Sequence, residues 1–376
     1  MRVTIDAVPL LVRSAGVKTY LYYWIQHLRK ASLGLDISLF PFLQAEPYSL
    51  NHEGSIVGPL GTSARLGLLY LLNLFPNDIS GWLDPRVDLF HTCKLLNPPR
   101  RAKLTATIHD FTCWLVPETH TPANVAADKH FAERILKRAD ALIAVSEATR
   151  CDAVRILNLP PEKIRVIHHG VRDIFFRVTP EIADAVRTRH GLHHPYFLFV
   201  GTIEPRKNLD LLLNAYGALP SSIRDEFDLV LAGSPGWAHS EIMARLREPA
   251  PGLRYLGYVP EQDLPGLVAG ATAFVYPSLY EGFGLPVIQA MAAGTPVITS
   301  SVSALRETAG GAALLIDPRS QADLRGAMQD LVTSPSRRAE LIDLGRSNAH
   351  RFSWSECARQ SLQFFEDVLG GCRVSR

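Results

Sequence analysis

The chain has few cysteines, no cluster of metal-binding residues and no excess of charge of either sign. Five cysteines occur in 376 residues, and none forms a Cys-x-x-Cys pair. We therefore expect reduced thiols in a cytosolic protein, with neither a disulfide framework nor a zinc site. Lys plus Arg number 39 and Asp plus Glu number 37, which leaves a net charge of +2. This balance argues against a dedicated nucleic-acid-binding protein.

Long hydrophobic runs are also lacking. The longest strongly apolar run, Leu66–Phe75, has about half the length of a bilayer-spanning helix. The N-terminus, Met1–Asp6, reads as a first strand that ends in an acid and not as a secretory signal. We expect a cytoplasmic protein without a transmembrane segment.

Short apolar runs typical of strands alternate with amphipathic stretches typical of helices along the whole chain. This alternation predicts α/β domains with parallel sheets. A first series of strands is expected at Arg2–Asp6, Ile37–Phe42, Val87–Thr92, Lys103–His109, Ala141–Ser146 and Arg165–His168. A second series is expected at Tyr196–Gly201, Asp228–Gly233, Leu253–Gly257, Ala273–Tyr276, Pro296–Thr299 and Ala313–Ile316.

The two series predict two doubly wound, Rossmann-like domains that face a central cleft. We place the first domain at residues 1–172 and the second at 173–353, because the polar stretch Arg172–Pro195 separates the two series. Residues 354–376 contain an amphipathic helix, which we expect to pack back on the first domain. Ligands bind at the carboxyl ends of strands in such folds, so the residues after each strand are candidates for the site.

Two loops of the second domain carry most of the candidates. Arg206 and Lys207 follow the strand that ends at Gly201, and cations beside a helix N-terminus form an anion site suited to a diphosphate. Glu281 begins a turn with Gly282 and Gly284, directly before a helix. The amides of residues 282–285 are expected to face the same ligand as the carboxylate, which can bind sugar hydroxyls.

The first domain offers two weaker candidates. His109 ends an apolar strand at the predicted cleft and is followed by Asp110, which favours a functional histidine over a structural one. Gly16 begins a helix after the first strand, and the amides there could approach a phosphate.

Several motifs together resemble the retaining glycosyltransferases of family 4. They are Phe199–Asn208, Ala232–Trp237 and Tyr276–Val297 in the second half, with Ile108–Asp110, Ala144–Thr149 and Arg165–Val171 in the first. The resemblance covers nearly the whole chain and implies the GT-B fold. The motif Gly-Thr-x-Glu-Pro-Arg-Lys-Asn is similar to the corresponding segment of bacterial mannosyltransferases of O-antigen and capsule assembly.

The resemblance implies a role for each candidate. Lys207 would bind the donor diphosphate, and Arg206 would supply a charge that many members carry at the position of Thr202. Glu281 would bind donor-sugar hydroxyls with the amides of Gly282, Phe283, Gly284 and Leu285. His109 would contact the donor sugar near its reacting carbon, and Gly16 would lie against the phosphates or the acceptor.

One position departs from the family pattern of two glutamates. Gln289 replaces the second, which usually holds the nucleotide ribose; an amide can still bond a diol, but the charge is lost. Two alternatives to an active transferase therefore stay open: a sugar-nucleotide epimerase of the same fold, and a low-activity or non-catalytic homologue.

The resemblance also implies the reaction and its partners. It implies a GDP- or UDP-sugar as the donor, with GDP-mannose favoured, and a glycan or lipid-linked glycan as the acceptor, in surface polysaccharide synthesis. No Asp-x-Asp triplet occurs, so no metal or other cofactor is expected. Basic and aromatic residues within Arg2–Lys30 suit peripheral contact with an anionic membrane, or a first helix whose Leu21, Trp24 and Leu28 pack on the sheet.

Overall fold

The protein divides into two compact units, which are described here separately. The computed structural model describes residues 1–14, 16–32, 34–43, 50, 52–74, 79–83, 86–237, 240–248 and 250–371. Unit 1 comprises Met1–Phe111, Ala126–Gly170 and Trp354–Arg376, and unit 2 comprises Thr112–Val125 and Val171–Ser353. Residues 112–125, which the sequence-based division assigned to the first domain, thus group with unit 2.

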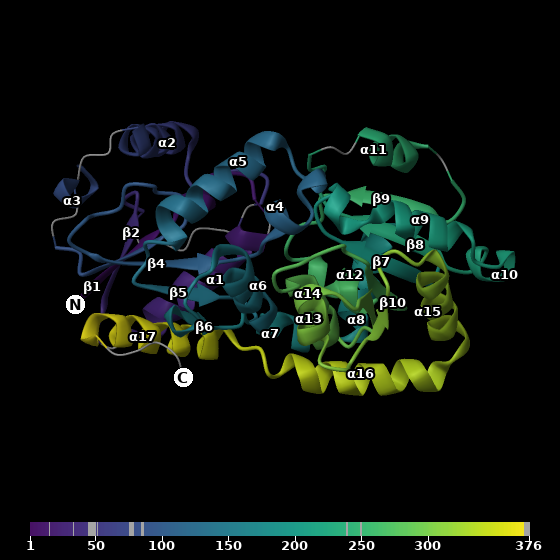
Figure 1. The fold of residues 1–376 in the computed structure, drawn as a ribbon. Helices are drawn as coiled ribbons and strands as arrows, with labels where there is room; N and C mark the ends of the chain where they lie inside the picture. Colours follow the sequence, from purple (N-terminus) through teal and green to yellow (C-terminus); the bar gives the residue numbers. More distant parts are fainter. Residues whose placement is uncertain are drawn as a thin grey trace. The chain divides into compact units, whose positions relative to one another are not determined.

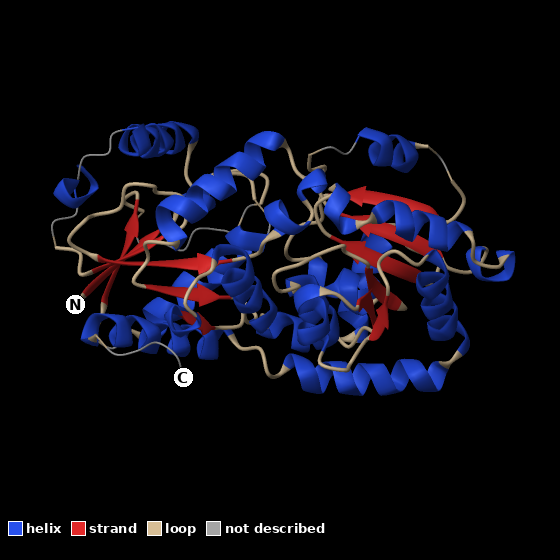
Figure 2. Ribbon diagram, in the orientation of Figure 1, coloured by secondary structure: helices blue, strands red, loops and turns tan. Residues whose placement is uncertain are grey.

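Unit 1 is built on a six-stranded parallel sheet with the strand order β2-β1-β3-β4-β5-β6 (Figures 1 and 2). Its strands are β1 (Arg2–Asp6), β2 (Asp36–Phe40), β3 (Leu89–Thr92), β4 (Lys103–Ile108), β5 (Ala141–Ala144) and β6 (Ile164–Val166). All four residues of β3 and of β5 are buried. This burial explains why β5, Ala-Leu-Ile-Ala, reads as an unbroken apolar run without alternation, whereas β3 also buries the polar residues His91 and Thr92.

The helices of unit 1 cover this sheet. They are α1 (Gly16–Ala31), α2 (Pro59–Leu74), α3 (Ile79–Leu83), α6 (Glu147–Leu157) and α17 (Trp354–Gly370), and α5 (Pro122–Phe131) begins in unit 2 and ends in unit 1. In α1, Leu21, Trp24 and Leu28 are fully buried, and the Trp24 indole donates a hydrogen bond to Ser361 of α17 at 2.9 Å. The expectation that these residues pack in the core is confirmed. Tyr20, Trp24 and Lys18 are buried as well, and contact of the remaining basic residues with a membrane stays a prediction.

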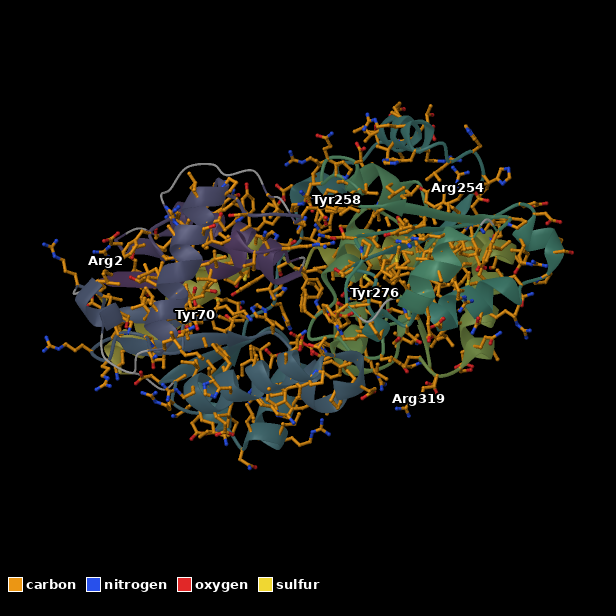
Figure 3. All side chains as sticks on the ribbon, turned by 90° about the horizontal axis from the view of Figure 1, so that it is seen from above. Arg2, Tyr70, Arg254, Tyr258, Tyr276 and Arg319 are labelled. Carbon is orange, nitrogen blue, oxygen red and sulfur yellow. The ribbon has the colours of Figure 1, made fainter. Side chains whose placement is uncertain are left out.

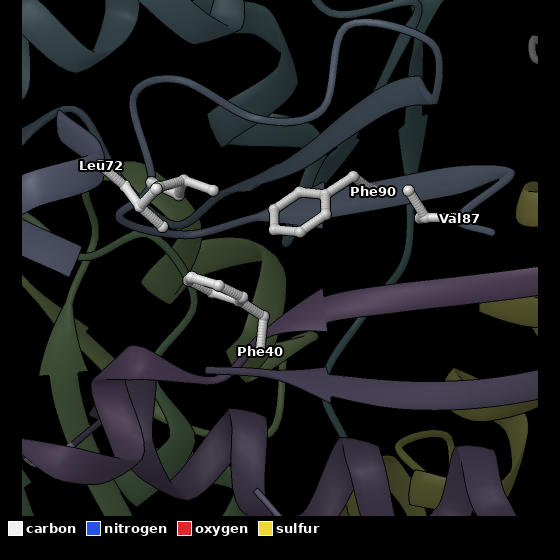
Figure 4. Packing of buried hydrophobic residues seen from close by; sticks show 5 residues of the cluster. Phe40, Leu72, Val87 and Phe90 are labelled. Carbon is white, nitrogen blue, oxygen red and sulfur yellow. The ribbon is translucent and has the colours of Figure 1, made fainter. Parts of the chain in front are cut away.

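Helix α2 is the one large feature of unit 1 that the sequence analysis treated only as an apolar run. Its residues Leu68, Leu69 and Leu72 pack on a cluster that contains Phe40, Val87, Phe90 and Leu95 (Figure 4). Its opposite face is exposed. Phe75, the last residue of the run, lies outside the described residues.

Unit 2 contains a second six-stranded parallel sheet, with the order β12-β11-β10-β7-β8-β9. Its strands are β7 (Tyr196–Val200), β8 (Asp228–Ala232), β9 (Leu253–Gly257), β10 (Ala273–Tyr276), β11 (Val297–Ser300) and β12 (Leu314–Ile316). The chain proceeds outward from β7 to β9 and then returns to the other side of β7 with β10. The order of the strands therefore reverses between β7 and β10, where such sheets bind ligands.

The helices of unit 2 cover the second sheet. They are α4 (Thr112–Leu115), α7 (Asp173–Phe176), α8 (Pro180–Arg189), α9 (Leu209–Gly217), α10 (Ser221–Arg224), α11 (Ser240–Arg247), α12 (Leu264–Ala269), α13 (Leu285–Ala292), α14 (Ser303–Ala309), α15 (Gln321–Thr333) and α16 (Pro335–Ala349). The core strands β7, β8 and β10 are almost wholly buried. The prediction of two doubly wound α/β units is confirmed.

Candidate functional site

The loops that follow β7 and β8 in unit 2 lie in direct backbone contact. Gly233 has a φ of +146°, and a Cβ built there would lie 1.8 Å from the carbonyl oxygen of Gly201. A Cβ on Gly236 would lie 2.8 Å from Thr202 Cγ2. Both glycines are therefore required for this approach. The contact fixes the backbone of the loop that carries Arg206 and Lys207.

Asn208 ties the same loop to two further loops. It adopts a left-handed conformation (φ 60°) at the start of α9. Its side-chain amide donates to the carbonyl oxygens of Pro277, after β10, at 3.0 Å and of Pro318, after β12, at 2.7 Å. The backbone amide of Leu279 also donates to the Arg206 carbonyl at 2.9 Å. The two loops that flank the reversal of strand order thus form one connected structure.

Lys207 lies inside this structure with 6% of its surface exposed. Its Nζ lies 2.6 Å from Glu281 Oε1 and 2.6 Å from the hydroxyl of Tyr276, a residue labelled in Figure 3. Nζ also lies over the Tyr276 ring, 4.9 Å from its centroid. The structure therefore brings together Lys207 and Glu281, which the sequence placed in separate motifs.

Arg206 joins the same group from the other side. Its Nη1 lies 2.6 Å from Glu281 Oε2 and donates to the Tyr280 carbonyl at 3.0 Å. Its Nη2 donates to Glu204 Oε1 at 2.6 Å. Glu204, with only 5% of its surface exposed, was not predicted as a site residue. Its one signal in the sequence was its place in the loop between Gly201 and Lys207.

The charges of this group shift one another's proton affinities. Burial opposes ionisation of Glu281, but Arg206 and Lys207 outweigh it and lower the carboxyl pKa to about 2. Burial, with the neighbouring Arg206, lowers the pKa of Lys207. Burial, with the charge of Glu281, raises the pKa of Tyr276. Glu281 is consequently an anion at neutral pH, held between two cations.

The turn after Glu281 is fixed by packing as well as by glycine. Gly284 has a φ of +100° and precedes α13 directly. The Phe283 ring is buried against Phe352, with centroids 5.6 Å apart, and its carbonyl accepts a hydrogen bond from Thr308. The backbone amide of Glu281 donates to the Ser303 hydroxyl at 3.0 Å. Phe283 therefore anchors the turn through its side chain, a role that the sequence did not predict.

Gln289 and Thr202 are the two positions at which the sequence departs from its family. Gln289 lies on α13 and is half-buried, as is Thr202 in the loop after β7. Leu285, at the start of α13, is buried. Neither Thr202 nor Gln289 belongs to the charged group, whose second cation is Arg206; its proposed charge on a diphosphate stays a prediction.

In unit 1, His109 follows β4 and belongs to a group of aromatic rings. Its ring lies edge-on to Tyr20, with centroids 5.1 Å apart, and 6.2 Å from His169. Tyr20 stacks on His169 at 4.5 Å, and Trp354 stacks on His169 at 6.0 Å. The Nε2 atom of His109 is shielded from solvent and has no hydrogen-bond partner among the described residues.

The histidines of this group are neutral at physiological pH. Burial lowers the pKa of His109 to about 4, although Asp110 opposes the shift. Burial, with the nearby His109, lowers the pKa of His91 to about 3 and that of His169 well below its usual range. His91 is hydrogen-bonded to Thr105 and Thr107, each at 3.0 Å. The sequence analysis did not predict His91, His169 or Tyr20 as members of this group.

Two further polar residues near the start of unit 1 have structural partners. Asp6 Oδ2 accepts hydrogen bonds from the backbone amides of Cys93, Lys94 and Leu95, at 3.0, 2.5 and 2.8 Å. Lys18 is fully buried and donates to the Gly54 carbonyl at 2.6 Å. By contrast, a Cβ added to Gly16 would meet nothing within 4 Å. The start of α1 thus has open space at Gly16, where a ligand was predicted.

No group of three or more His, Cys, Asp or Glu side chains among the described residues is arranged to hold a metal ion. Among the same residues, no helix has the length and apolar character needed to cross a bilayer.

Comparison with solved structures identifies the fold. Sucrose-phosphate synthase from Thermosynechococcus elongatus aligns with a TM-score of 0.77 and 22% identity, over 99% of this chain and 100% of that one. The lipopolysaccharide glycosyltransferase WaaG aligns with a TM-score of 0.67 and 15% identity, over 99% and 100%. Anabaena HepE, solved with UDP-glucose, gives 0.72 and 18%, over 98% and 100%. These likenesses confirm the predicted GT-B class of two Rossmann-like domains.

Comparison of sequences identifies the family. A model described as "Glycosyltransferase Family 4" matches residues 14–173, and one described as "Glycosyl transferases group 1" matches residues 184–348. O-antigen chain mannosyltransferase B of Escherichia coli is 33% identical over 282 residues, which are 74% of this chain and 74% of that protein. Serotype-specific mannosyltransferase WbdA of Escherichia coli is 28% identical over 239 residues, 62% of this chain but only 29% of the much longer WbdA. The chain belongs, as its motifs predict, to the glycosyltransferases of family 4 with a group 1 domain.

Proposed function

We propose that this glycosyltransferase moves mannose from GDP-mannose to a sugar acceptor in surface polysaccharide synthesis, with retention of the anomeric configuration. The observation that carries the proposal is the buried Lys207–Glu281 pair between the ends of β7 and β10. The 33% identity to O-antigen chain mannosyltransferase B supports the choice of mannose and of an O-antigen-like product.

The charged group in unit 2 can perform the electrostatic part of this reaction. When the bond from the sugar to the diphosphate breaks, negative charge develops on the leaving phosphate. The Lys207 ammonium and the backbone amides at the start of α13 can stabilise that charge. Glu281, ionised at neutral pH because its pKa is about 2, can accept hydrogen bonds from sugar hydroxyls. Binding of the sugar and stabilisation of the leaving group then depend on adjacent residues.

A retaining path without an enzyme nucleophile fits these residues. The Glu281 carboxylate is held by two cations at 2.6 Å each, which makes it a poor candidate for covalent attack. In the proposed front-face path, the acceptor hydroxyl attacks the anomeric carbon on the side from which the phosphate leaves. The leaving phosphate takes the hydroxyl proton, and the products are the glycoside and the nucleoside diphosphate.

His109 is proposed to contact the donor sugar as a neutral imidazole. Its pKa of about 4 keeps it uncharged at pH 7, and its Nε2 lacks a partner among the described residues. A neutral ring can donate or accept one hydrogen bond to a sugar hydroxyl without adding charge near the reacting carbon.

The proposed acceptor is linked to a lipid, and α2 supports contact with a membrane. Leu60, Tyr70, Leu71 and Leu74 of this helix are exposed by 89, 66, 53 and 53%, and Tyr70 is labelled in Figure 3. The sole charged residue of α2 is Arg65, which donates to the Pro41 carbonyl at 3.1 Å. Sedimentation with vesicles, with and without anionic lipid, tests this contact, and Leu71→Glu is expected to reduce it.

A panel of nucleotide sugars tests the proposed function. The protein is incubated with GDP-mannose, UDP-glucose, ADP-glucose and dTDP-glucose, and the release of nucleoside diphosphate is measured with and without glycan acceptors. We expect GDP release from GDP-mannose, and an NMR spectrum of the product that has the donor's anomeric configuration. Interconversion of the sugars without release would instead indicate an epimerase, and no reaction would indicate a non-catalytic homologue.

The proposal includes independence from metal ions. Transfer is expected to proceed at an unchanged rate in EDTA, because Lys207 and the α13 amides take the place of a metal on the diphosphate. Strong inhibition by EDTA that manganese reverses would contradict this part of the proposal.

A further inference from the structure

The contacts of Arg206 are more numerous than a simple anion-binding role requires. Its Nη1 lies 2.6 Å from Glu281 Oε2 and donates a hydrogen bond to the Tyr280 carbonyl at 3.0 Å. Its Nη2 is directed to Glu204, at 2.6 Å. The side chain of Arg206 is only 12% exposed. Its planar fork therefore bridges two carboxylates and a backbone carbonyl, a geometry that a lysine could not reproduce.

The charges of the group also cancel. Glu204 and Glu281 together carry −2, and Arg206 and Lys207 carry +2. A site whose purpose was only to attract a diphosphate would keep a positive excess. The buried carboxylate of Glu204, 3% exposed, removes that excess, although burying it is unfavourable unless it is paired. Its presence needs another explanation than anion binding.

We propose that Glu204 is a positioning residue, which holds Arg206 in the one orientation that directs the Glu281 carboxylate toward the donor sugar. The order of contacts is Glu204 to Arg206 to Glu281, while Lys207 approaches the other oxygen of Glu281. Glu204 contacts neither donor nor acceptor in this arrangement. The inference rests on the proposed function, because it assigns the sugar to Glu281 and the diphosphate to Lys207.

The positioning role predicts that a change at Glu204 weakens binding of the sugar portion of the donor without weakening binding of the nucleoside diphosphate. In Glu204→Gln the side chain keeps its size, but the group gains a net positive charge. Binding of a nucleoside diphosphate should stay equal or become tighter, because the ligand is an anion. Binding of the sugar portion should weaken, because Arg206 is no longer held by a charged partner and Glu281 loses its fixed direction.

The experiment measures dissociation constants by calorimetry for two matched pairs, GDP with GDP-mannose and UDP with UDP-glucose. For the pair that the wild type binds, the measured quantity is the ratio of the affinity for the nucleotide sugar to the affinity for its nucleotide. This ratio should fall by about tenfold in Glu204→Gln, the size typical of a lost charge-assisted hydrogen bond. Glu340→Gln is the matched control, because Glu340 pairs with Arg337 at 2.5 Å on an exposed helix of the same unit. Its ratio should equal that of the wild type.

Arg206→Lys provides a second variant that keeps the charge and loses the fork. If Arg206 acts as a bridge, this variant should lower the same ratio as Glu204→Gln does, and the double variant should lower it no further than either single change. Additive losses in the double variant would overturn the inference.

Other outcomes are equally decisive. If Glu204→Gln leaves the affinity ratio unchanged, or weakens binding of the nucleotide and of the nucleotide sugar equally, Glu204 is not a positioning residue. The proposed function would still stand in that case. A wild type that binds neither pair would remove the proposed function and this inference together. Thermal unfolding of each variant distinguishes a loss of folded protein from a change in recognition.

Discussion

The polar groups at the sheet ends of the two units differ in how they are held. In unit 2, four ionised side chains, Glu204, Arg206, Lys207 and Glu281, hold one another at 2.6 Å. In unit 1, His109, His169 and Tyr20 meet through ring faces and edges, and the histidines are neutral. Charged side chains that pair with one another can exchange these partners for the charges of a ligand. Neutral rings instead bind a ligand through packing contacts and single hydrogen bonds. The first kind of site offers both cations and a carboxylate to a ligand, whereas the second can add one hydrogen bond without charge.

The largest expected effect comes from removing a charge in unit 2. Lys207→Ala should lower turnover by about 10²- to 10³-fold, the usual cost of losing one group that stabilises a leaving anion. Glu281→Ala should also abolish turnover, because it removes the proposed contact to the sugar. Initial rates of nucleotide release measure both, and circular dichroism checks that each variant folds. A rate near that of the wild type in either variant would contradict the site assignment.

Acidification should affect unit 1 before unit 2. The folded pKa values of His109 and His91 are about 4 and about 3, below the ordinary histidine value of 6.5. The unfolded chain therefore binds more protons below pH 6.5, and unit 1 should lose about 2 kcal/mol per histidine between pH 7 and 5. Glu281, with a folded pKa of about 2 against 4.5, loses its contribution only as the pH falls from 4.5 toward 2.

Hydrogen exchange at pH 7 and pH 5 measures this difference. Amides of β4 should lose protection on acidification, whereas those of β10 should change little. His109→Gln should remove part of the loss in β4. Equal loss in both strands, or earlier loss in β10, would show that the histidines do not control the acid stability of unit 1.

Replacement by alanine should affect stability at Gly284 but not at Gly16. Gly284→Ala should destabilise unit 2 by about 1–2 kcal/mol, because its φ of +100° disfavours a side chain and the new Cβ would lie 2.8 Å from Leu305 Cδ2. Gly16→Ala should leave stability unchanged, since nothing lies within 4 Å of the added atom. It should weaken ligand binding if the donor or acceptor approaches there. Thermal unfolding and titration with the donor separate the two effects.

The smallest effect concerns the Tyr276 hydroxyl. Tyr276→Phe keeps the ring under Lys207 and removes the 2.6 Å contact to Nζ. Diphosphate binding should weaken by roughly threefold to tenfold, the range for one hydrogen bond of ordinary strength, because the Tyr276 hydroxyl acts only through Lys207. An unchanged dissociation constant for GDP would indicate that Glu281 alone orients Lys207.

The sequence allowed the sheets to be predicted, and it named Lys207 and Glu281, which the structure brings together. The largely buried strands Tyr196–Val200 and Asp228–Ala232 appear as almost continuous apolar runs, and the residues after them are limited to the edge where such sheets bind ligands. Lys207, Glu281 and His109 therefore emerged from pattern and position, and family resemblance supplied their roles.

Side-chain partners across loops could not be predicted in the same way. The pairing of Glu204 with Arg206, two residues apart, depends on the turn at Pro205–Lys207 and on Glu281 approaching from another strand. The burial of Lys18 likewise depends on the Gly54 carbonyl, 36 residues away. Helix α2 escaped notice as a helix because its glycines and its nearly uncharged sequence hide an amphipathic pattern. Its exposed apolar face is evident only once Leu72 is seen to point inward.

Asn208 has a consequence for protein engineering. One side-chain amide connects the segment after β7 to Pro277 and to Pro318, and Gly233 lies in close backbone contact with Gly201 at the start of the same segment. Residues 201–207 grafted from a relative with another donor preference would therefore have to fit between fixed contacts at both ends. A chimera designed to change the donor should instead exchange all four strand-end loops as a cassette, with Asn208 retained at the junction.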